Sequence, residues 1–447
     1  MSKHLKSLWV IFLIALILRS LVLIVAIQHP QRTISNDTPS YIRPAESLLE
    51  GHGYSFPGVL RTPLYPMFLA FFFALFGENL VIIVLAQVIV SALTVVLTYQ
   101  VGILLLPRRA ALIGAFLLAL SLESIIDPFF ILTDPLFALL FLGAAYAFLR
   151  YRSAGRISWL ISSAILMGLS ILCRPIAIYY PVAVIILLAM LHWKHWVNLF
   201  TKSLVYLAVL AAVLAAWFVR SQVVDGAPIL STISNYNLLF YNVASLDTSL
   251  HGGNVNQYRD SYSLLVQKAL DDKGLPRTEA NLDGVYKTLA VKKILANPVQ
   301  FAIVQVKDDL QNLLPGWANI LQILAPTGQV GIQGTDVLKQ GGLSGVYQTY
   351  FGGRLWLMVL ILPFIILLGA VYLSDLMGTV FLVRTKGWFT LAVLVLPVAY
   401  LMLIPGAPSN SRFRIPAMPE LCLLAGIGID WIWGRLSQNR KSSRSIT

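Results

Sequence analysis

A polar segment between two apolar stretches, residues 28–79, contains the side chains best suited to carry chemistry. It holds a carboxylate at Asp37, a guanidinium at Arg61, and the tyrosines Tyr54 and Tyr65. A carboxylate within hydrogen-bond reach of a hydroxyl group can take its proton as that hydroxyl attacks. A guanidinium offers paired N–H donors to a phosphate. These groups together predict a transfer reaction that uses a base and releases an anion.

Later parts of the chain place further ionisable groups at the ends of apolar stretches. Asp134 opens one such stretch, and Arg412 and Arg414 precede the last one. Charged groups at membrane depth are costly, so they are functional candidates by default. We therefore take Asp134 as a second candidate catalytic acid, and both arginines as candidate ligands of the leaving anion. Glu123 and Asp127, between two apolar stretches, are interpreted as solvated loop acids.

Each of these residues also has a purely structural alternative. Asp37 and Asp134 both stand where a helix could begin, and aspartate is a favoured N-cap residue. Arg412 and Arg414 can anchor a membrane span at the lipid headgroups. The two tyrosines can pack at the membrane interface instead of stacking on a sugar. Both kinds of role stay open for these residues at the level of sequence.

The composition is that of a membrane protein with many spans. The chain has 447 residues, of which 57% are hydrophobic and 12% charged, with a mean hydropathy of +0.76. Soluble domains carry about 25% charged residues. The net charge is +13, but the basic residues are spread between apolar runs, which argues against nucleic-acid binding. Cys173 and Cys422 lie within apolar runs, and we expect no disulfide between them.

The apolar runs predict an all-α polytopic fold with about ten spans, because about 20 residues cross a bilayer. An additional aromatic stretch, residues 63–76, is expected to lie in the membrane interface. The first apolar run is interpreted as a retained helix and not as a cleavable signal peptide. Counted in this way, the spans are 8–27, 80–106, 110–122, 129–149, 159–173, 176–191, 204–219, 354–373, 388–404 and 417–433.

Basic residues concentrate in the loops that this arrangement places in the cytoplasm, which puts both termini on that side. The candidate acids and arginines then all lie on the outer face of a cytoplasmic (inner) membrane. Three parts are expected: residues 1–222, with the catalytic outer loop 28–79; an extracytoplasmic or interfacial region, 223–353; and residues 354–447, with the last spans and a basic tail.

The order of several short motifs resembles the GT-C superfamily of glycosyltransferases. Within it, the chain is similar to the branch of protein O-mannosyltransferases, aminoarabinose transferases and Rgt-type enzymes, which belong to the family 39-like group. The resemblance covers residues 8–220 well and 405–434 moderately, and it does not extend to 223–353. The motifs are Asp37 with Tyr41 and Ala45, Gly51-His52-Gly53-Tyr54, Arg61-Thr62-Pro63-Leu64-Tyr65-Pro66, Phe76-Gly77, Ile131-Leu132-Thr133-Asp134-Pro135-Leu136-Phe137, Gly168-Leu169-Ser170, Arg174-Pro175 and Arg412-Phe413-Arg414-Ile415-Pro416.

The resemblance implies transfer of a sugar from a polyprenyl-phosphate donor, such as an undecaprenyl phosphate, to an acceptor outside the cytoplasm. Asp37 matches the catalytic acid of the family, and would act as general base in an inverting reaction. Arg61, Arg412 and Arg414 would stabilise the leaving phosphate. The acceptor class stays open between lipid, glycan and protein. Relatives that glycosylate proteins often have Glu where this chain has Thr38, and the aminoarabinose branch has Lys where it has Thr62.

The competing interpretation is a multi-pass transporter or lipid flippase without transferase activity. Transporters often contain paired repeats and charged or broken helices at the bilayer midplane. We find no such repeat, and the charges lie at span ends, so the transferase is favoured. A scaffold role would predict that the outer acids tolerate substitution.

No cofactor site is indicated by the sequence. It contains neither a phosphate-binding glycine-rich loop nor a dinucleotide-binding fingerprint. His52 and His251 lack the spacing of metal ligands, so no metal site is indicated. The pairs Asp271-Asp272 and Asp308-Asp309 are interpreted as helix-surface acids.

Overall fold

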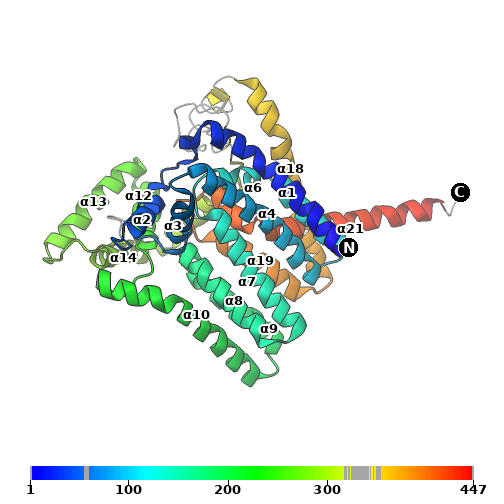
Figure 1. The fold of residues 1–447 in the computed structure, drawn as a ribbon, viewed down its shortest axis with the longest axis horizontal. Coiled ribbons are helices and arrows are strands. Elements are labelled where there is room, and N and C mark those ends of the chain that lie inside the picture. The colour runs from blue at the N-terminus through cyan, green and yellow to red at the C-terminus, as the bar shows by residue number, and fades with distance from the viewer. Residues whose placement is uncertain are drawn as a thin grey trace.

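The computed structural model describes residues 3–54, 60–316, 320, 323, 342, 344–345, 347–348 and 354–444. Within these residues the regular structure is entirely helical (Figure 1), as the apolar runs predicted. Backbone groups in a bilayer must be satisfied inside the chain, and a helix does this for each segment separately.

Helices α1–α10 form the N-terminal part of the fold. Short helical turns connect several of them, including η1 (Pro30–Thr33), η2 (Asp127–Phe129) and η3 (Pro175–Tyr179). The helices are α1 (Lys3–Gln28), α2 (Pro39–Leu49), α3 (Leu64–Phe76), α4 (Leu80–Leu105), α5 (Arg108–Leu120), α6 (Leu122–Ile126), α7 (Asp134–Ala154), α8 (Ile157–Cys173), α9 (Pro181–His192) and α10 (Trp196–Asp225).

The rest of the described chain begins with a helical region and ends with long apolar helices. The turns in this half are η4 (Leu238–Val243), η5 (Leu310–Leu313) and η6 (Ile415–Ala417). The helices are α11 (Ile233–Asn237), α12 (Ala244–His251), α13 (Val255–Asp271), α14 (Glu279–Ala296), α15 (Pro298–Asp309), α18 (Leu355–Arg384), α19 (Trp388–Leu403), α20 (Ser411–Arg414) and α21 (Met418–Arg444).

The expected count of about ten spans is not confirmed. The described residues contain 7 helices long and apolar enough to cross a membrane, or up to 9 if each of two bent pairs is one span. Two predicted spans fall short, because α8 has 17 residues and α19 has 16. A third, α5, bends by 59° into Leu122–Phe129. The interfacial stretch forms α3, a short apolar helix of 13 residues.

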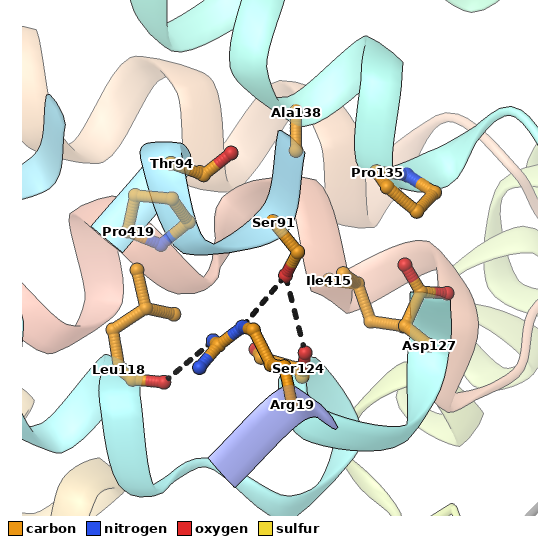
Figure 2. Close-up of a pocket in the computed structure, with 10 residues that line it drawn as sticks. All are labelled: Arg19, Ser91, Thr94, Leu118, Ser124, Asp127, Pro135, Ala138, Ile415 and Pro419. Carbon is orange, nitrogen blue, oxygen red and sulfur yellow. Dashed lines mark hydrogen bonds between the residues drawn. The ribbon is translucent and has the colours of Figure 1, made fainter. Parts of the chain in front are cut away.

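At the bend between α5 and α6, backbone carbonyl groups accept hydrogen bonds from Arg19, which is 1% exposed. Its guanidinium donates to the carbonyls of Leu118 at 3.3 Å and Ala119 at 3.4 Å, at the C-terminal end of α5. Its Nε donates to Ser91 Oγ at 2.8 Å, and Ser91 donates to the Ser124 carbonyl at 3.3 Å (Figure 2). A cation is favourable beside a helix C-terminus. Arg19 therefore holds the kinked segment that leads towards Asp134.

Glycines let α21 approach its neighbours closely. A Cβ on Gly428 would lie 2.1 Å from the Ser374 carbonyl oxygen of α18, and one on Gly426 would lie 2.3 Å from the Ala110 carbonyl oxygen of α5. Small residues permit such contacts between membrane helices. This packing brings the segment before α21, which contains Arg412, against the N-terminal helices.

Helices α11–α14 surround a second apolar core, separate from that of the membrane helices. It lies between η4, α13 and α14, and these helices lie at one end of the molecule in Figure 1. Its central side chains include Leu239, Val243, Leu270, Tyr286 and Ala290.

Candidate active site

Asp37 lies between η1 and α2 and binds two arginines. Its Oδ1 accepts from Arg61 Nη2 at 3.1 Å, and its Oδ2 accepts from Arg412 Nη1 at 3.0 Å. The Asp37 side chain remains 41% exposed. The N-cap residue of α2 is Thr38, so Asp37 does not act as the N-cap of this helix. Its carboxylate instead binds two side chains that lie 24 and 375 residues away in sequence.

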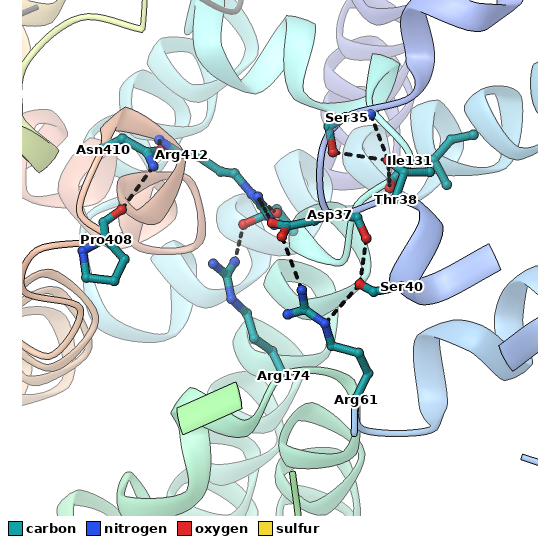
Figure 3. Close-up of polar contacts among 11 residues, drawn as sticks. Ser35, Asp37, Thr38, Ser40, Arg61, Ile131, Arg174, Pro408, Asn410 and Arg412 are labelled. Atoms are coloured by element: carbon teal, nitrogen blue, oxygen red, sulfur yellow. Dashed lines mark hydrogen bonds and ion pairs between the residues drawn. The ribbon is translucent and has the colours of Figure 1, made fainter. Parts of the chain in front are cut away.

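Asp134 is the first residue of α7, and its side chain is 0% exposed. Its Oδ2 accepts from Arg412 Nε at 2.6 Å, and its Oδ1 accepts from Arg174. The N-cap of α7 is Thr133, so this carboxylate is also directed at arginines. The two acids therefore share Arg412. Figure 3 shows Arg412 and Arg61 directed at Asp37.

These contacts join five residues into one chain of ion pairs, which we call the ion-pair cluster. It contains three guanidinium groups and two carboxylates, so its formal charge is +1 with all groups ionised. The side chains come from the loop between α1 and α3, the start of α7, the end of α8 and the start of α20. In order, the cluster is Arg61, Asp37, Arg412, Asp134 and Arg174.

Arg61 is oriented by the first loop itself. Its Nε donates to Ser40 Oγ at 3.0 Å, and Ser40 donates to the Asp37 carbonyl at 2.6 Å. Its guanidinium carbon lies 4.9 Å from the Tyr41 ring centroid. The Tyr54 hydroxyl donates to the Arg61 carbonyl at 2.9 Å. Tyr54 thus supports Arg61 from behind, and burial raises the pKa of its phenol, which keeps it a neutral donor.

Arg174 was part of a family motif in the sequence, but we assigned it no role there. It follows α8 directly, and its guanidinium carbon lies 4.8 Å from the Phe413 ring centroid. Thr62 Oγ1 donates to the carbonyl of Cys173 at 3.1 Å, which ties this turn to the first loop. A cation at the end of a predicted span, on the same predicted face as Asp37 and Asp134, was the signal that could have identified it.

The charge of Asp37 is favoured by its neighbours. Burial acts to raise the pKa of its carboxyl, but Arg412 and Arg61 outweigh burial and hold the pKa below its ordinary value. Asp37 is therefore a carboxylate at neutral pH. A carboxylate has about four lone-pair positions, and two are used by arginines.

Arg414 and Tyr65 lie outside the ion-pair cluster, although the sequence suggested both as substrate ligands. Arg414 is 0% exposed and donates to Glu123 Oε1 at 2.8 Å. Tyr65 is 0% exposed, and its hydroxyl donates to Gln87 Oε1 at 2.7 Å. Gln87 in turn donates to the carbonyls of Pro128 at 3.0 Å and Phe130 at 2.8 Å. In the structure both side chains brace the segments that lead to the cluster.

Our interpretation of Glu123 and Asp127 as solvated loop acids was wrong. Glu123 is 8% exposed and Asp127 is 5% exposed. The chain turns at the α5–α6 bend and stays buried until α7, so both acids lie inside the protein. The interpretation of Asp309 as a surface acid was also wrong, since it is 4% exposed.

The Tyr65→Phe variant is expected to destabilise the fold and to leave the affinity for the expected polyprenyl-phosphate sugar unchanged. Loss of the Tyr65 hydroxyl leaves Gln87 Oε1 buried without its hydrogen-bond partner. An unsatisfied buried acceptor costs about 1–3 kcal/mol. Thermal unfolding of the purified protein gives the loss of stability, and the donor KM gives the affinity. A raised KM with unchanged stability would show instead that the Tyr65 hydroxyl contacts substrate.

Metal ligands do not cluster in the described residues. No group of three or more His, Cys, Asp or Glu side chains there lies close enough to hold a metal ion. Both carboxylates of the ion-pair cluster are engaged by guanidinium groups.

Comparison with known proteins places the fold in the GT-C class. Residues 60–219 match the family model of dolichyl-phosphate-mannose-protein mannosyltransferases. No curated protein matches the chain by sequence. Among solved structures, the archaeal oligosaccharyltransferase AglB from Archaeoglobus fulgidus, in complex with an inhibitory peptide and a dolichol-phosphate, is similar at 14% identity and a TM-score of 0.53. That alignment covers 99% of this chain and 52% of AglB, so the chain spans about half the length of the oligosaccharyltransferase.

Two other solved structures are also similar. The same oligosaccharyltransferase in the apo form aligns at 14% identity and a TM-score of 0.52, over 99% of this chain and 52% of the other. ArnT from Cupriavidus metallidurans bound to undecaprenyl phosphate aligns at 14% identity and a TM-score of 0.44, over 94% of this chain and 77% of the other.

Proposed function

From the GT-C fold of this chain, we propose that it is an integral membrane glycosyltransferase that takes a sugar from a polyprenyl-phosphate donor. The acceptor is a lipid, a glycan or a protein on the extracytoplasmic face of the inner membrane, and both termini are cytoplasmic. The family that matches residues 60–219 is named for a dolichyl-phosphate-mannose donor, and AglB was solved with a dolichol-phosphate. Both support a donor in which a lipid phosphate carries the sugar.

The observation that carries the proposal is a half-exposed carboxylate set among arginines. Asp37 is the most exposed acid or base of the ion-pair cluster, at 41%, whereas Arg61, Arg412 and Arg174 are 14%, 16% and 11% exposed. A base must reach its substrate, and cations that stabilise a leaving phosphate act most strongly where water is excluded. The cluster provides both conditions side by side.

The chemistry follows from these groups. The acceptor hydroxyl attacks the anomeric carbon of the donor sugar while Asp37 takes the hydroxyl proton. The bond between the anomeric carbon and the phosphate oxygen breaks, and its electron pair leaves on the polyprenyl phosphate. Arg61 and Arg412 bind that phosphate through N–H groups that Asp37 does not occupy. One base and one displacement, without a covalent intermediate, invert the anomeric configuration.

Asp134 has a different part in this scheme. It is fully buried between Arg412 and Arg174, so it does not reach an acceptor in this arrangement. Its charge fixes two guanidinium groups in position and balances them while the phosphate is absent. We therefore assign the proton transfer to Asp37 and the orientation of the arginines to Asp134.

The three parts of the chain have distinct tasks in this proposal. Residues 1–222 supply the base Asp37 and two arginines of the ion-pair cluster, Arg61 and Arg174. Residues 354–447 supply Arg412 and the last spans. Residues 223–353 shape the choice of acceptor. Exchange of that region with the region of a relative should change acceptor preference while the donor stays the same; an unchanged acceptor would contradict this assignment.

The Arg61→Gln variant is expected to move the acid limb of the pH profile upward. Asp37 is active as the carboxylate, so activity falls as pH drops through its pKa. In the wild-type protein that pKa lies below the ordinary value for aspartate. Removing one of the two arginines leaves less positive charge to oppose burial, so the pKa of Asp37 rises. The measurement is kcat/KM against pH for both proteins. Coincident acid limbs would show that Arg61 does not set the charge of Asp37.

Turnover with a panel of short-chain polyprenyl-phosphate sugars tests the proposal. Purified protein in lipid nanodiscs is incubated with each donor, and the release of polyprenyl phosphate is measured with and without extracts that contain acceptors. We expect release with one donor of the panel, and that donor identifies the sugar. If no donor binds or turns over, the transferase is rejected and the transporter interpretation takes its place.

A further inference from the structure

The loop that carries Arg412 to the ion-pair cluster is held by another part of the chain. It runs between α19 and α20, residues 404–410, and turns at Gly406, which has a φ of 67°. Asp309, at the end of α15, accepts from the Gly406 amide at 2.7 Å and from Ser409 Oγ at 2.8 Å, both through Oδ1. This single oxygen therefore closes the turn on both sides.

Two more side chains from the same region hold the loop. Asn242, in η4, accepts from the Ala407 amide through Oδ1 at 2.9 Å. Gln305, one turn before Asp309 on α15, donates to the Ile404 carbonyl at 3.0 Å. We call Asn242, Gln305 and Asp309 the loop clamp. A Cβ on Gly406 would lie 2.4 Å from Gln305 Oε1, so the clamp leaves no space for a side chain at the turn.

Burying the carboxylate of Asp309 has a high cost in free energy. It is 4% exposed, and among the described residues no Lys, Arg or His side chain forms an ion pair with it. A buried carboxylate without a cation is costly unless it is well hydrogen-bonded. The two shortest hydrogen bonds that Asp309 accepts, from Gly406 and Ser409, both come from the loop. Charged acceptors make stronger hydrogen bonds than neutral ones. The position of the loop is what this charge stabilises.

The clamped loop lies close in sequence to Arg412, which binds both acids of the ion-pair cluster. Ser409 is three residues before Arg412, and Asn410 caps α20 by accepting from the Arg412 amide at 3.0 Å. α20 is a single turn of 4 residues. With so short a helix, the direction of the Arg412 side chain depends on where the loop is anchored. Arg412 has to reach Asp37 and Asp134 together, so a small shift of the loop breaks one of the two contacts.

We propose that Asp309 is a positioning residue for Arg412, and that the α11–α15 region acts on the reaction through this clamp. The inference rests on the proposed function and deepens it, because it connects the region that chooses the acceptor with the arginine that serves base and leaving group. Asp309 contacts neither substrate nor reacting atoms; it holds the loop that aims Arg412.

Asp309→Leu is the decisive variant, and Asp309→Asn is its conservative partner. The amide oxygen of Asn can still accept from Gly406 and Ser409, whereas Leu can accept from neither. We expect Asp309→Leu to lower kcat by about 10- to 100-fold, as misplacement of a catalytic group does, and Asp309→Asn to restore most of it. Ser409→Ala removes only one bond and is the milder variant if Asp309→Leu folds poorly. Asp283→Leu is the matched control, since Asp283 is bound to Asn235 within the same region.

A double-mutant cycle separates positioning from general destabilisation. If Asp309 acts through Arg412, then adding Asp309→Leu to Arg412→Gln causes no further loss of kcat. If the two losses multiply, Asp309 does not act through Arg412 and the proposal is overturned.

Hydrogen exchange of the Gly406 amide gives a readout that does not depend on catalysis. We expect exchange about tenfold faster in Asp309→Leu than in wild type, and unchanged exchange in Asp283→Leu. Wild-type exchange in Asp309→Leu would overturn the clamp whatever the activity. An inactive wild-type protein with the expected exchange would reject the transferase and support the clamp, so the two failures are distinguishable.

Discussion

Asp37→Asn is expected to lower kcat by about 100- to 10,000-fold, the usual contribution of a general base. The amide is the same size as the carboxylate, but it cannot accept a proton at neutral pH. Donor affinity should stay the same or increase, because the formal charge of the ion-pair cluster rises from +1 to +2 when one carboxylate is removed. Stability should change little, because the side chain is 41% exposed.

The measurement is the single-turnover release of polyprenyl phosphate, together with the dissociation constant of the donor. Asp430→Asn is a matched control. Asp430 pairs with Arg109 at 3.3 Å, so this variant also loses one carboxylate, with one ion pair where Asp37→Asn loses two. It lies on α21, 12 residues beyond the start of that helix, or about 18 Å along it. Wild-type turnover by Asp37→Asn would contradict the assignment of the base, and equal losses in both variants would indicate a general charge effect.

Most of the ion-pair cluster could be predicted because topology orders the ends of membrane spans. Asp37, Asp134 and Arg412 all adjoin apolar runs that end on the same face, although hundreds of residues separate them. The alternation of spans alone brings such residues to one surface. What this reasoning could not supply was the pairing, namely that Arg412 bridges both acids.

Arg412 and Arg414 show why the remaining partners were not predictable. They have the same chemistry and lie two residues apart, and no sequence pattern distinguishes them. Residues two apart on a helix point in different directions. On α20, Arg412 therefore reaches the cluster at 16% exposure while Arg414 is fully buried. Which of the two faces the site depends on the rotation of α20, and that depends on contacts with other parts of the chain.

One of the three unconfirmed spans, α5, and the two buried acids failed for a common reason. The apolar run that ends near residue 122 looked like a span that reaches the membrane surface, so Glu123 and Asp127 were expected in water. The chain bends there because Arg19, more than 95 residues earlier in sequence, satisfies the carbonyls at the break. A hydropathy pattern carries no information about such a partner.

Arg414→Met is expected to destabilise the fold by about 3–5 kcal/mol, the cost of breaking a buried ion pair. Met fills a similar length but leaves Glu123 buried without its cation. The same change removes donors from the carbonyls of Asn312 and Leu314 and from the hydroxyl of Tyr372. Thermal unfolding of the purified protein gives the loss, and donor affinity of the folded fraction gives the functional effect, which we expect to be absent.

A second substitution distinguishes this structural role from substrate binding. In the double variant with Glu123→Gln, no buried charge remains unpaired, so part of the lost stability should return, because removing both charges costs less than removing one. Arg435→Met is the control for loss of an exposed arginine, since Arg435 lies on α21 and packs on Trp431. If Arg414→Met folds as well as wild type and raises the donor KM, then Arg414 is a phosphate ligand. Stability regained on addition of Glu123→Gln can come only from the buried pair, because a phosphate ligand would have no reason to respond to the charge of Glu123.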